Sequence, residues 1–321
     1  MERARICLVT PALASSNNGN WHTASRWARG LSPDYRVTLV QRYGGEDADL
    51  LIALHARRSA DSIAAWADAQ PRRPLIVVLT GTDLYRDIAV DAQAQRSLQL
   101  ADRLIVLNQL GAAVLPQAER HKVRVCLQSA PARRTLAKST RRLRAVMVGH
   151  LRAEKAPETF MAAAEALAGR DDILLDHIGA ALDPALGRSA AALAARLPRY
   201  RWLGALTHAQ VRALDVCARL LVQASRMEGG AHTVIEAVAS GTPVLASRID
   251  GTLGLLGTDY AGCFEVGDAL GLVALLQRCR DDPAMLALLR RQCDARAALF
   301  DPARERATVR GLVAEMLENT R

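Results

Sequence analysis

Short apolar runs rich in β-branched residues alternate with polar loops and helical stretches through the first part of the chain. The expected strands are Arg5–Thr10, Arg36–Val40, Leu50–Leu54, Leu75–Leu79, Arg103–Leu107 and Val123–Leu127. After the first strand a polar loop leads into a helix whose apolar face carries Ala24, Trp27 and Leu31. Strands that alternate with helices form parallel sheets, so this part predicts a doubly wound α/β domain.

A second series of the same kind begins at Arg144. We expect strands at Arg144–Val148, Ile173–Ile178, Tyr200–Leu203, Leu220–Val222 and Pro243–Ala246, and helices at Pro157–Ala168, Ala209–Ala218, Thr233–Ala239 and Pro302–Asn319. The basic, aperiodic stretch Pro131–Arg142 between the two series is typical of an exposed connection. The pattern predicts an N-terminal domain at residues 1–140, a second domain at 141–300, and a final helix at 301–321 that packs back on the first.

Length and composition narrow this picture. A chain of 321 residues suits two domains that each bury a core. No apolar run approaches the roughly 20 residues needed to cross a bilayer, and Met1–Thr10 does not resemble a signal peptide. The six cysteines are scattered without metal-ligand spacing. We therefore expect a cytoplasmic protein with reduced thiols and no membrane span.

The formal charge of +9 is compatible with an anionic partner. Many arginines are spread along expected helices, and no basic run is interleaved with aromatic residues as a nucleic-acid binder would need. Phosphate groups of a small substrate are therefore the favoured partner, and no nucleic acid is expected. Asp47 and Asp49 could suggest a metal site, but they stand at the start of an expected strand, so no metal is implied.

The strongest chemical signal is the segment Glu228–Glu236, in which a small-residue loop enters a helix. Small residues let backbone N–H groups approach a ligand, and a helix N terminus favours an anion such as a diphosphate. A glutamate one turn into the helix can accept hydrogen bonds from ribose hydroxyls. Two glutamates at this spacing also occur on solvated helices, so the assignment depends on the neighbouring segments.

The neighbouring segments resemble, in order, the landmarks of GT-B glycosyltransferases of the family 4 type. They are Val148–Lys155, Tyr200–Gly204, Ala218–Ser225 and Ser240–Ser247. The resemblance covers the second half of the chain closely and the first half more loosely. It implies an α/β fold of the GT-B class, with two doubly wound Rossmann-like domains facing across a cleft, and sugar transfer from a nucleotide-diphosphate donor.

The resemblance also assigns roles by position. Glu228 would face the sugar or stabilise charge near its anomeric carbon. Lys155 would neutralise the leaving diphosphate, and Glu236 would bind the ribose. His150 stands where the family usually has arginine, so diphosphate binding would be weaker, pH-sensitive or shared with Arg152. The other expected nucleotide-sugar contacts are Gly19, Asn20, Gly229, Gly230, Ala231, His232 and Thr233.

Polar residues at the carboxyl ends of first-half strands form the expected acceptor site. They are Asn17, Asn18, Thr23, Arg26, Arg42, Thr80 and Asp83. Hydrogen-bonding groups and arginines without a long apolar groove suit a small polar or anionic acceptor better than a lipid. His55 ends a strand on the same side, where it either touches substrate or packs against the protein.

The segments Ser15–Arg29, Thr80–Asp87 and Ser225–Ala237 together resemble the selenosugar synthase branch of the family, which works in selenoneine biosynthesis. That resemblance implies a UDP-sugar donor of the glucose or N-acetylglucosamine type and selenophosphate as acceptor, with no cofactor. One alternative is a UDP-sugar-dependent glycosyltransferase acting on a hydroxyl of a small molecule or glycan. Another is a catalytically silent nucleotide-sugar-binding protein. The sequence determines neither the preferred sugar nor the oligomeric state.

Overall fold

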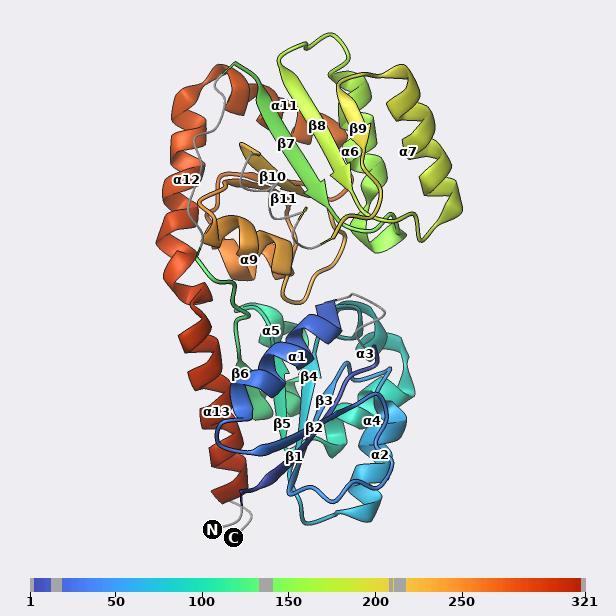
Figure 1. Ribbon diagram of the computed structural model, residues 1–321, viewed down its shortest axis with the longest axis vertical. Helices are drawn as coiled ribbons and strands as arrows, with labels where there is room; N and C mark the ends of the chain where they lie inside the picture. Colours follow the sequence, from blue (N-terminus) through green and yellow to red (C-terminus); the bar gives the residue numbers. More distant parts are fainter. Residues whose placement is uncertain (1–2, 13–18, 133–140, 208–209, 211–217, 319–321) are drawn as a thin grey trace. The chain divides into compact units, whose positions relative to one another are not determined.

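The first six apolar runs form one parallel sheet in the order β2-β1-β3-β4-β5-β6 (Figure 1). Its strands are β1 (Arg5–Val9), β2 (Arg36–Val40), β3 (Leu50–Leu54), β4 (Leu75–Leu79), β5 (Arg103–Val106) and β6 (Val123–Val125). The computed structural model describes residues 3–12, 19–132, 141–207, 210 and 218–318. Within them the chain forms two compact units. The first unit comprises Met1–Ser129, Glu228–Gly230 and Asp301–Arg321.

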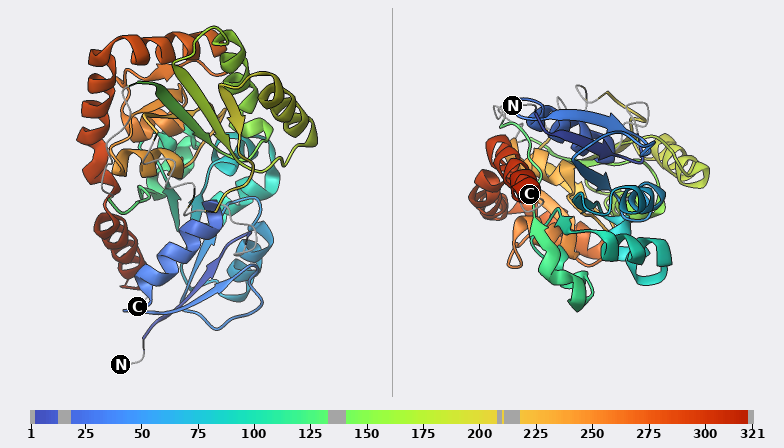
Figure 2. Two further views of the ribbon diagram at one scale, coloured as in Figure 1. Left: turned by 45° about the horizontal axis from the view of Figure 1, so that its top comes forward. Right: turned by 90° about the horizontal axis from the view of Figure 1, so that it is seen from below.

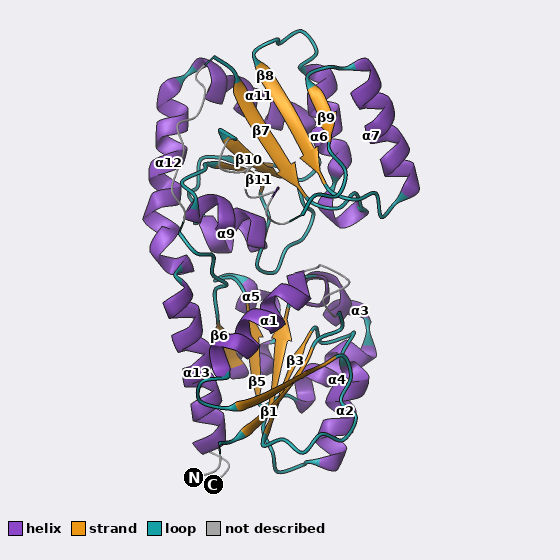
Figure 3. Cartoon of the chain, viewed as in Figure 1, coloured by secondary structure: helices purple, strands orange, loops and turns teal. Residues whose placement is uncertain are grey.

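Helices cover both faces of this first sheet (Figure 3). They are α1 (Gly19–Leu31), α2 (Ala60–Ala69), the π-helical turn η2 (Asp83–Asp87), α3 (Ile88–Val90), α4 (Ala92–Leu100), α5 (Gly111–Val114), η3 (Gln117–Lys122) and α13 (Pro302–Glu318). Successive strand residues point to opposite faces, so β1 contributes Ile6 and Leu8 to one core and Cys7 and Val9 to the other. Burial on both faces explains why these strands are continuous apolar runs.

The last helix of the chain completes the core of the first unit. Val309, Leu312, Val313 and Met316 of α13 are buried in the same cluster as Trp27 of α1. The two helices lie side by side in both views (Figure 1, Figure 2). Residues separated by most of the chain therefore form one hydrophobic core.

The second unit comprises Ala130–Met227 and Ala231–Phe300 and contains a parallel sheet in the order β12-β11-β10-β7-β8-β9. Its strands are β7 (Leu143–Val148), β8 (Ile173–Ile178), β9 (Tyr200–Trp202), β10 (Leu220–Gln223), β11 (Val244–Ser247) and β12 (Cys263–Phe264). Its helices are η4 (Ala153–Lys155), α6 (Pro157–Ala166), α7 (Pro184–Arg196), α9 (His232–Ala239), α10 (Asp250–Leu256), α11 (Ala269–Asp281), α12 (Pro283–Ala297) and η5 (Ala298–Phe300).

The predicted fold class of two doubly wound α/β domains is confirmed. Of the expected helix Ala209–Ala218, the structure describes only Gln210 and Ala218.

In the second unit, strand order reverses between β7 and its neighbour β10. Ligands of doubly wound sheets bind beyond the carboxyl ends of the strands at such a reversal. Within the described residues, no helix is both long and apolar enough to span a bilayer.

Candidate functional site

The loop that follows β7 carries Lys155 on a short, well-defined turn. Ala156 adopts a left-handed conformation (φ 45°), which ends η4 and directs the chain into α6 at Pro157. The aliphatic stem of Lys155 lies against Gly149, where a Cβ would approach the lysine Cγ and Cδ at 3.4 Å. The turn therefore fixes the stem of Lys155 beside the end of β7.

His150 lies in the same loop and is linked to the loop after β8. The N–H of Ala180 donates to His150 Nδ1 at 3.1 Å, so the proton of the neutral ring is on Nε2. Burial lowers the pKa of His150, and the positive charges of Arg152 and Lys155 lower it further. At neutral pH His150 is therefore an uncharged hydrogen-bond donor at the position where the family has a permanent cation.

Close packing of two backbones holds these loops together. A Cβ on Gly179 would overlap with the carbonyl oxygen of Gly149, and Gly179 has a φ of 153°. The N–H of Leu151 donates to the Ala180 carbonyl at 2.8 Å. Glycine at position 179 thus allows the β7 and β8 loops to share backbone hydrogen bonds.

Helix α9 follows the loop after β10 and is eight residues long. Ala231 precedes it and has no side-chain acceptor that could cap the helix, so its first N–H groups suit an external anion. Glu236 lies one turn inside and is 9% exposed. Its Oε2 is 3.7 Å from Nδ1 of His232. This combination favours an anion at the helix terminus and a hydroxyl group at Glu236.

The β7 and β10 loops meet at the strand-order reversal of the second sheet. The N–H of Arg226 donates to the Glu154 carbonyl at 2.9 Å, and its guanidinium bonds Glu158 at 2.8 Å. The structure therefore brings the predicted residues His150, Arg152 and Lys155 to the same sheet edge as Ala231, His232, Thr233 and Glu236.

Two residues that the sequence analysis did not single out support α9. Gln223, at the end of β10, is buried and accepts a hydrogen bond from the Thr233 hydroxyl at 3.3 Å. Its amide donates to the Ser225 hydroxyl at 2.9 Å. Both lie within the landmark segment Ala218–Ser225, and their own sequence signal is polar residues directly after an apolar run.

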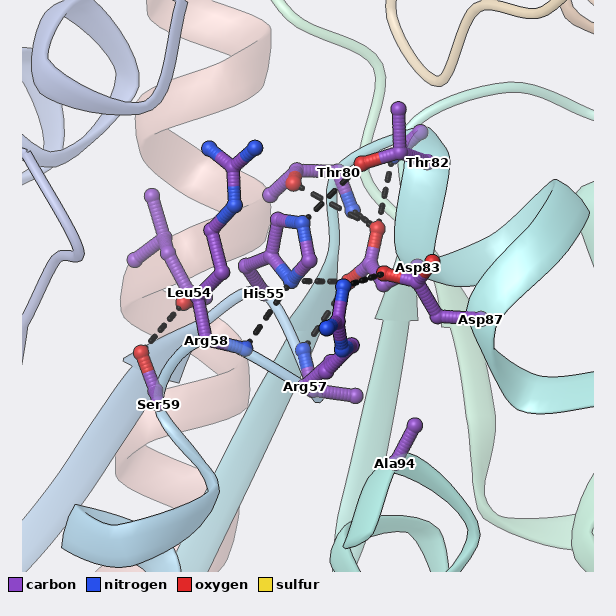
Figure 4. A network of polar contacts seen from close by, with 12 residues as sticks. Leu54, His55, Arg57, Arg58, Ser59, Thr80, Thr82, Asp83, Asp87 and Ala94 are labelled. Atoms are coloured by element: carbon purple, nitrogen blue, oxygen red, sulfur yellow. Dashed lines mark hydrogen bonds and ion pairs between the residues drawn. The ribbon is translucent and has the colours of Figure 1, made fainter. Parts of the chain in front are cut away.

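In the first unit, a network of buried polar groups surrounds His55 at the carboxyl end of β3 (Figure 4). The Arg58 N–H donates to its Nδ1 at 3.3 Å, so its Nε2–H donates to the Thr82 hydroxyl at 3.0 Å. Burial lowers its pKa, and the nearby Asp83 partly opposes this effect. His55 has a φ of 73°, a strained conformation that packing must maintain. Of the two interpretations, the structure favours packing.

Asp83, an expected acceptor contact, is completely buried in this network. Its Oδ1 accepts from the N–H groups of Thr80 and Gly81 at 2.9 and 2.8 Å, and its Oδ2 accepts from Ala56 at 3.0 Å. Both carboxylate oxygens thus shape the turn between Thr80 and Asp83. This geometry favours a role for Asp83 in the turn rather than a contact with the acceptor.

Arg26 and Thr23 are also engaged inside the first unit. Arg26 donates to the buried Glu305 carboxylate through Nε at 2.7 Å and Nη2 at 3.0 Å. The Thr23 hydroxyl donates to the Gly19 carbonyl at 2.8 Å and accepts from Gln128. These bonds hold the start of α1, where Gly19 and Asn20 lie.

Arg42 is exposed beyond the edge strand β2, which β1 and β3 separate from β4. The structure therefore does not bring Arg42 next to Thr80. Asn17 and Asn18 lie outside the described residues.

Asp47 and Asp49 serve to fix the start of β1. Asp47 bonds the guanidinium groups of Arg5 and Arg73, and these partners lower its pKa. Asp49 accepts from the Arg5 N–H at 2.8 Å. In the described part of the chain, no group of three or more His, Cys, Asp or Glu side chains is arranged to hold a metal ion.

Comparisons with known proteins agree with this fold. A family model described as glycosyl transferases group 1 matches residues 129–298. Sucrose-phosphate synthase from Thermosynechococcus elongatus is similar in structure, with a TM-score of 0.80 at 16% identity over 99% of this chain and 100% of that one. HepE from Anabaena, in complex with UDP and glucose, has a TM-score of 0.75 at 17% identity over 99% and 100%.

A glycosyltransferase from Rickettsia africae is also similar, with a TM-score of 0.74 at 13% identity over 99% of this chain and 100% of that one. At such identities the likeness shows the fold alone, which is the expected GT-B fold. No curated protein sequence matches this chain.

Proposed function

Because the chain belongs to the glycosyl transferases group 1 family, we propose that it transfers a sugar from a UDP-sugar to selenophosphate and so forms a carbon–selenium bond. The donor sugar is of the glucose or N-acetylglucosamine type. The product after loss of phosphate is a 1-seleno-sugar for selenoneine biosynthesis. The acceptor comes from the sequence resemblance described above.

The donor site of the proposal rests on the edge of the second sheet where the Lys155 loop meets the loop that leads into α9. An anion there would be near a helix N terminus and near Lys155, whose stem is fixed at the end of β7. Departure of UDP places extra negative charge on the diphosphate, and fixed positive groups stabilise it more than they stabilise the bound substrate. We assign the diphosphate to Lys155, Arg152 and His150.

The proposed binding of the donor's nucleoside depends on Glu236. Its carboxylate is largely buried one turn into α9, where it would accept hydrogen bonds from the ribose hydroxyls. HepE of Anabaena was solved with UDP and with UDP-glucose, which supports a uridine nucleotide as the donor of this chain. We assign Ala231, His232 and Thr233 to the phosphates or the sugar through the first turn of α9.

The proposed chemistry balances without a protein base. Selenium attacks the anomeric carbon, the C–Se bond forms, and the C–O bond to the diphosphate breaks with its electrons leaving on UDP. Water then attacks phosphorus, the Se–P bond breaks, and phosphate and the 1-seleno-sugar are released. Selenophosphate is already an anionic nucleophile, whereas a hydroxyl acceptor would need deprotonation. Glu228 would stabilise positive charge near the anomeric carbon.

The set of residues that we propose for the acceptor site is smaller than the set predicted from the sequence. Because Arg26 is bonded to Glu305 and Asp83 to three backbone N–H groups, we place the acceptor phosphate nearest the hydroxyl of Thr80. This hydroxyl donates to Asp83 over a long 3.4 Å contact and can donate to a phosphate oxygen instead. We keep Gly19 and Asn20 at the start of α1 as nucleotide-sugar contacts.

Mass spectrometry of the products tests the proposal directly. The purified protein is mixed with UDP-glucose or UDP-N-acetylglucosamine and selenophosphate, with thiophosphate, phosphate and a panel of alcohols in parallel reactions. We expect a seleno-sugar mass and an equal amount of UDP only with selenophosphate. Efficient glycosylation of an alcohol with no selenium product would establish the hydroxyl-acceptor alternative instead. UDP binding without turnover of any donor would establish the silent binding protein.

A further inference from the structure

The residues Glu228–Gly230 belong to the first unit, which holds them by backbone packing. A Cβ on Gly229 would overlap with the carbonyl of Thr80, and a Cβ on Gly81 would lie 3.0 Å from the Gly229 nitrogen. The backbone of Gly229 therefore lies in direct contact with the backbone of Thr80 and Gly81. The glycine at 229 is needed for this packing, whether or not it also approaches a ligand.

Asn108 holds the same turn from the end of β5. Its side chain is fully buried, and its Nδ2 donates to the Gly229 carbonyl at 2.8 Å. The same nitrogen donates to the Tyr85 hydroxyl at 2.9 Å, while Oδ1 accepts from the Leu110 N–H at 3.0 Å. Both amide protons and the carbonyl oxygen are therefore used, which fixes the orientation of the side chain.

The surface on which Gly229 rests is itself rigid. Asp83 binds the N–H groups of Thr80 and Gly81, and His55 donates to Thr82 in the same turn. Gly230 is held as well, because a Cβ there would lie 2.5 Å from Oε1 of Gln128. The position of the Glu228 backbone therefore depends on two preorganised neighbours, the Thr80–Asp83 turn and Asn108.

We propose that Asn108 is a positioning residue that acts through Gly229 to fix Glu228 for sugar transfer. The role of Glu228 rests on the proposed function, whereas the hydrogen bond between Asn108 and Gly229 does not. The rigid amide of Asn108 fixes the Gly229 backbone and therefore holds the neighbouring Glu228 in place before the reaction. The Glu228 carboxylate can then stabilise the positive charge that develops at the anomeric carbon. The groups assigned to the diphosphate and the ribose, Lys155, Arg152, His150 and Glu236, lie in the second unit, so we expect loss of the bond to change turnover and to leave UDP binding intact.

Asn108→Asp isolates this bond. The carboxylate keeps the shape of the side chain and the acceptor for Leu110, but it places an oxygen against the Gly229 carbonyl. We expect kcat for UDP release from the UDP-sugar to fall by about tenfold or more, with the Kd for UDP within about twofold of wild type. Amide hydrogen exchange in the peptide spanning Gly229–Ala231 should become faster. Tyr85→Phe is the control, because it removes the other partner of the same nitrogen, and its kcat should stay near wild type.

The outcomes separate the two proposals. Wild-type kcat and wild-type exchange in Asn108→Asp would overturn the positioning role, as would a fall in UDP affinity that matches the fall in kcat. If the wild-type protein turns over no UDP-sugar, the proposed function fails, and the exchange rate at Gly229–Ala231 still decides the role of Asn108. Should Asn108→Asp not fold, Asn108→Ala removes the same hydrogen bond without the added charge and is expected to lower kcat with unchanged UDP affinity; wild-type kcat there contradicts the inference.

Discussion

The side chain of Lys155 is positioned by its stem as well as by its charge. The left-handed Ala156 ends the turn, and Gly149 leaves room for the methylene groups of the lysine. Removal of the whole side chain would therefore mix a packing effect with an electrostatic one. A variant that keeps the stem separates them.

Lys155→Met should lower kcat/KM by about a hundredfold, because the charge that Lys155 meets grows as UDP departs. The thermal unfolding midpoint should change little, since methionine keeps the contact with Gly149. Steady-state kinetics and a melting curve on the same preparation check both expectations. Lys122→Met is the matched control, because Lys122 pairs with Glu119 in the first unit and lies outside the proposed site. Wild-type kcat/KM in Lys155→Met would remove the leaving-group role.

The strand β8 carries a buried histidine that makes the second unit sensitive to acid. His177 is 0% exposed, its Nδ1 lies 2.9 Å from the Tyr200 hydroxyl, and it packs against Phe160. Burial lowers its pKa to about 4. The unfolded chain binds a proton at this residue near pH 6.5, whereas the folded chain does not until about pH 4. The neutral ring therefore contributes stability that is fully present above pH 6.5 and is lost as the pH falls toward 4.

Because of His177, the free energy of unfolding should fall by about 2 kcal/mol when the pH is lowered from 7 to 5. Urea unfolding at both pH values measures the loss, and His177→Gln should reduce it. His121→Gln serves as the control, because His121 is exposed on η3 of the first unit. Equal pH dependence in wild type and His177→Gln would show that His177 does not titrate as expected.

The strands of the first unit could be predicted because each is a run of mostly apolar residues. All six expected runs differ from the observed strands by no more than two residues, from the fully buried Leu50–Leu54 to the partly exposed Val123–Val125. The strand β12 was missed because its two residues, Cys263–Phe264, are too short to form an apolar run. The local pattern is therefore enough for a run of several apolar residues and fails for a strand of two.

The hydrogen bonds and ion pairs between distant side chains could not be predicted from the sequence, for a different reason. Arg26 was expected to face an acceptor, yet its partner Glu305 lies 279 residues further along the chain. Asn108 and Gly229 are 121 residues apart. Periodicity and spacing report on neighbours in sequence, so contacts of this kind follow only from the three-dimensional fold.

At the scale of the whole molecule, Glu305 joins the two ends of the first unit. It is 3% exposed and accepts hydrogen bonds from Arg26, from the Trp27 ring N–H at 2.7 Å, and from the Ser129 N–H at 3.0 Å. A single carboxylate thus connects α13 with α1 and with the end of the segment Met1–Ser129. Its removal takes this counter-ion from the partly buried guanidinium of Arg26 and the acceptor from Trp27 and Ser129.

Glu305→Ala should destabilise the first unit by about 3–5 kcal/mol, because breaking a buried pair leaves an uncompensated charge. Glu315→Ala on the same helix is the control. Its pair with Arg103 is more exposed, with the Glu315 side chain 35% accessible, and such a pair contributes about 1 kcal/mol or less. Denaturant unfolding of both variants makes the comparison. Equal shifts in the two midpoints would contradict the anchoring role of Glu305.

The return of α13 to the first unit has a consequence for biosynthesis. The ribosome makes Asp301–Arg321 after the other residues of both units, so the sheet that emerges first lacks this helix on one face until that segment has been synthesised. The second unit, made of Ala130–Met227 and Ala231–Phe300, has all of its residues before that helix is synthesised. Domains generally fold in the order in which they emerge. Here all residues of the second unit are available first, and the core that contains Leu8, Leu50 and Ile52 is completed only after α13 has been synthesised.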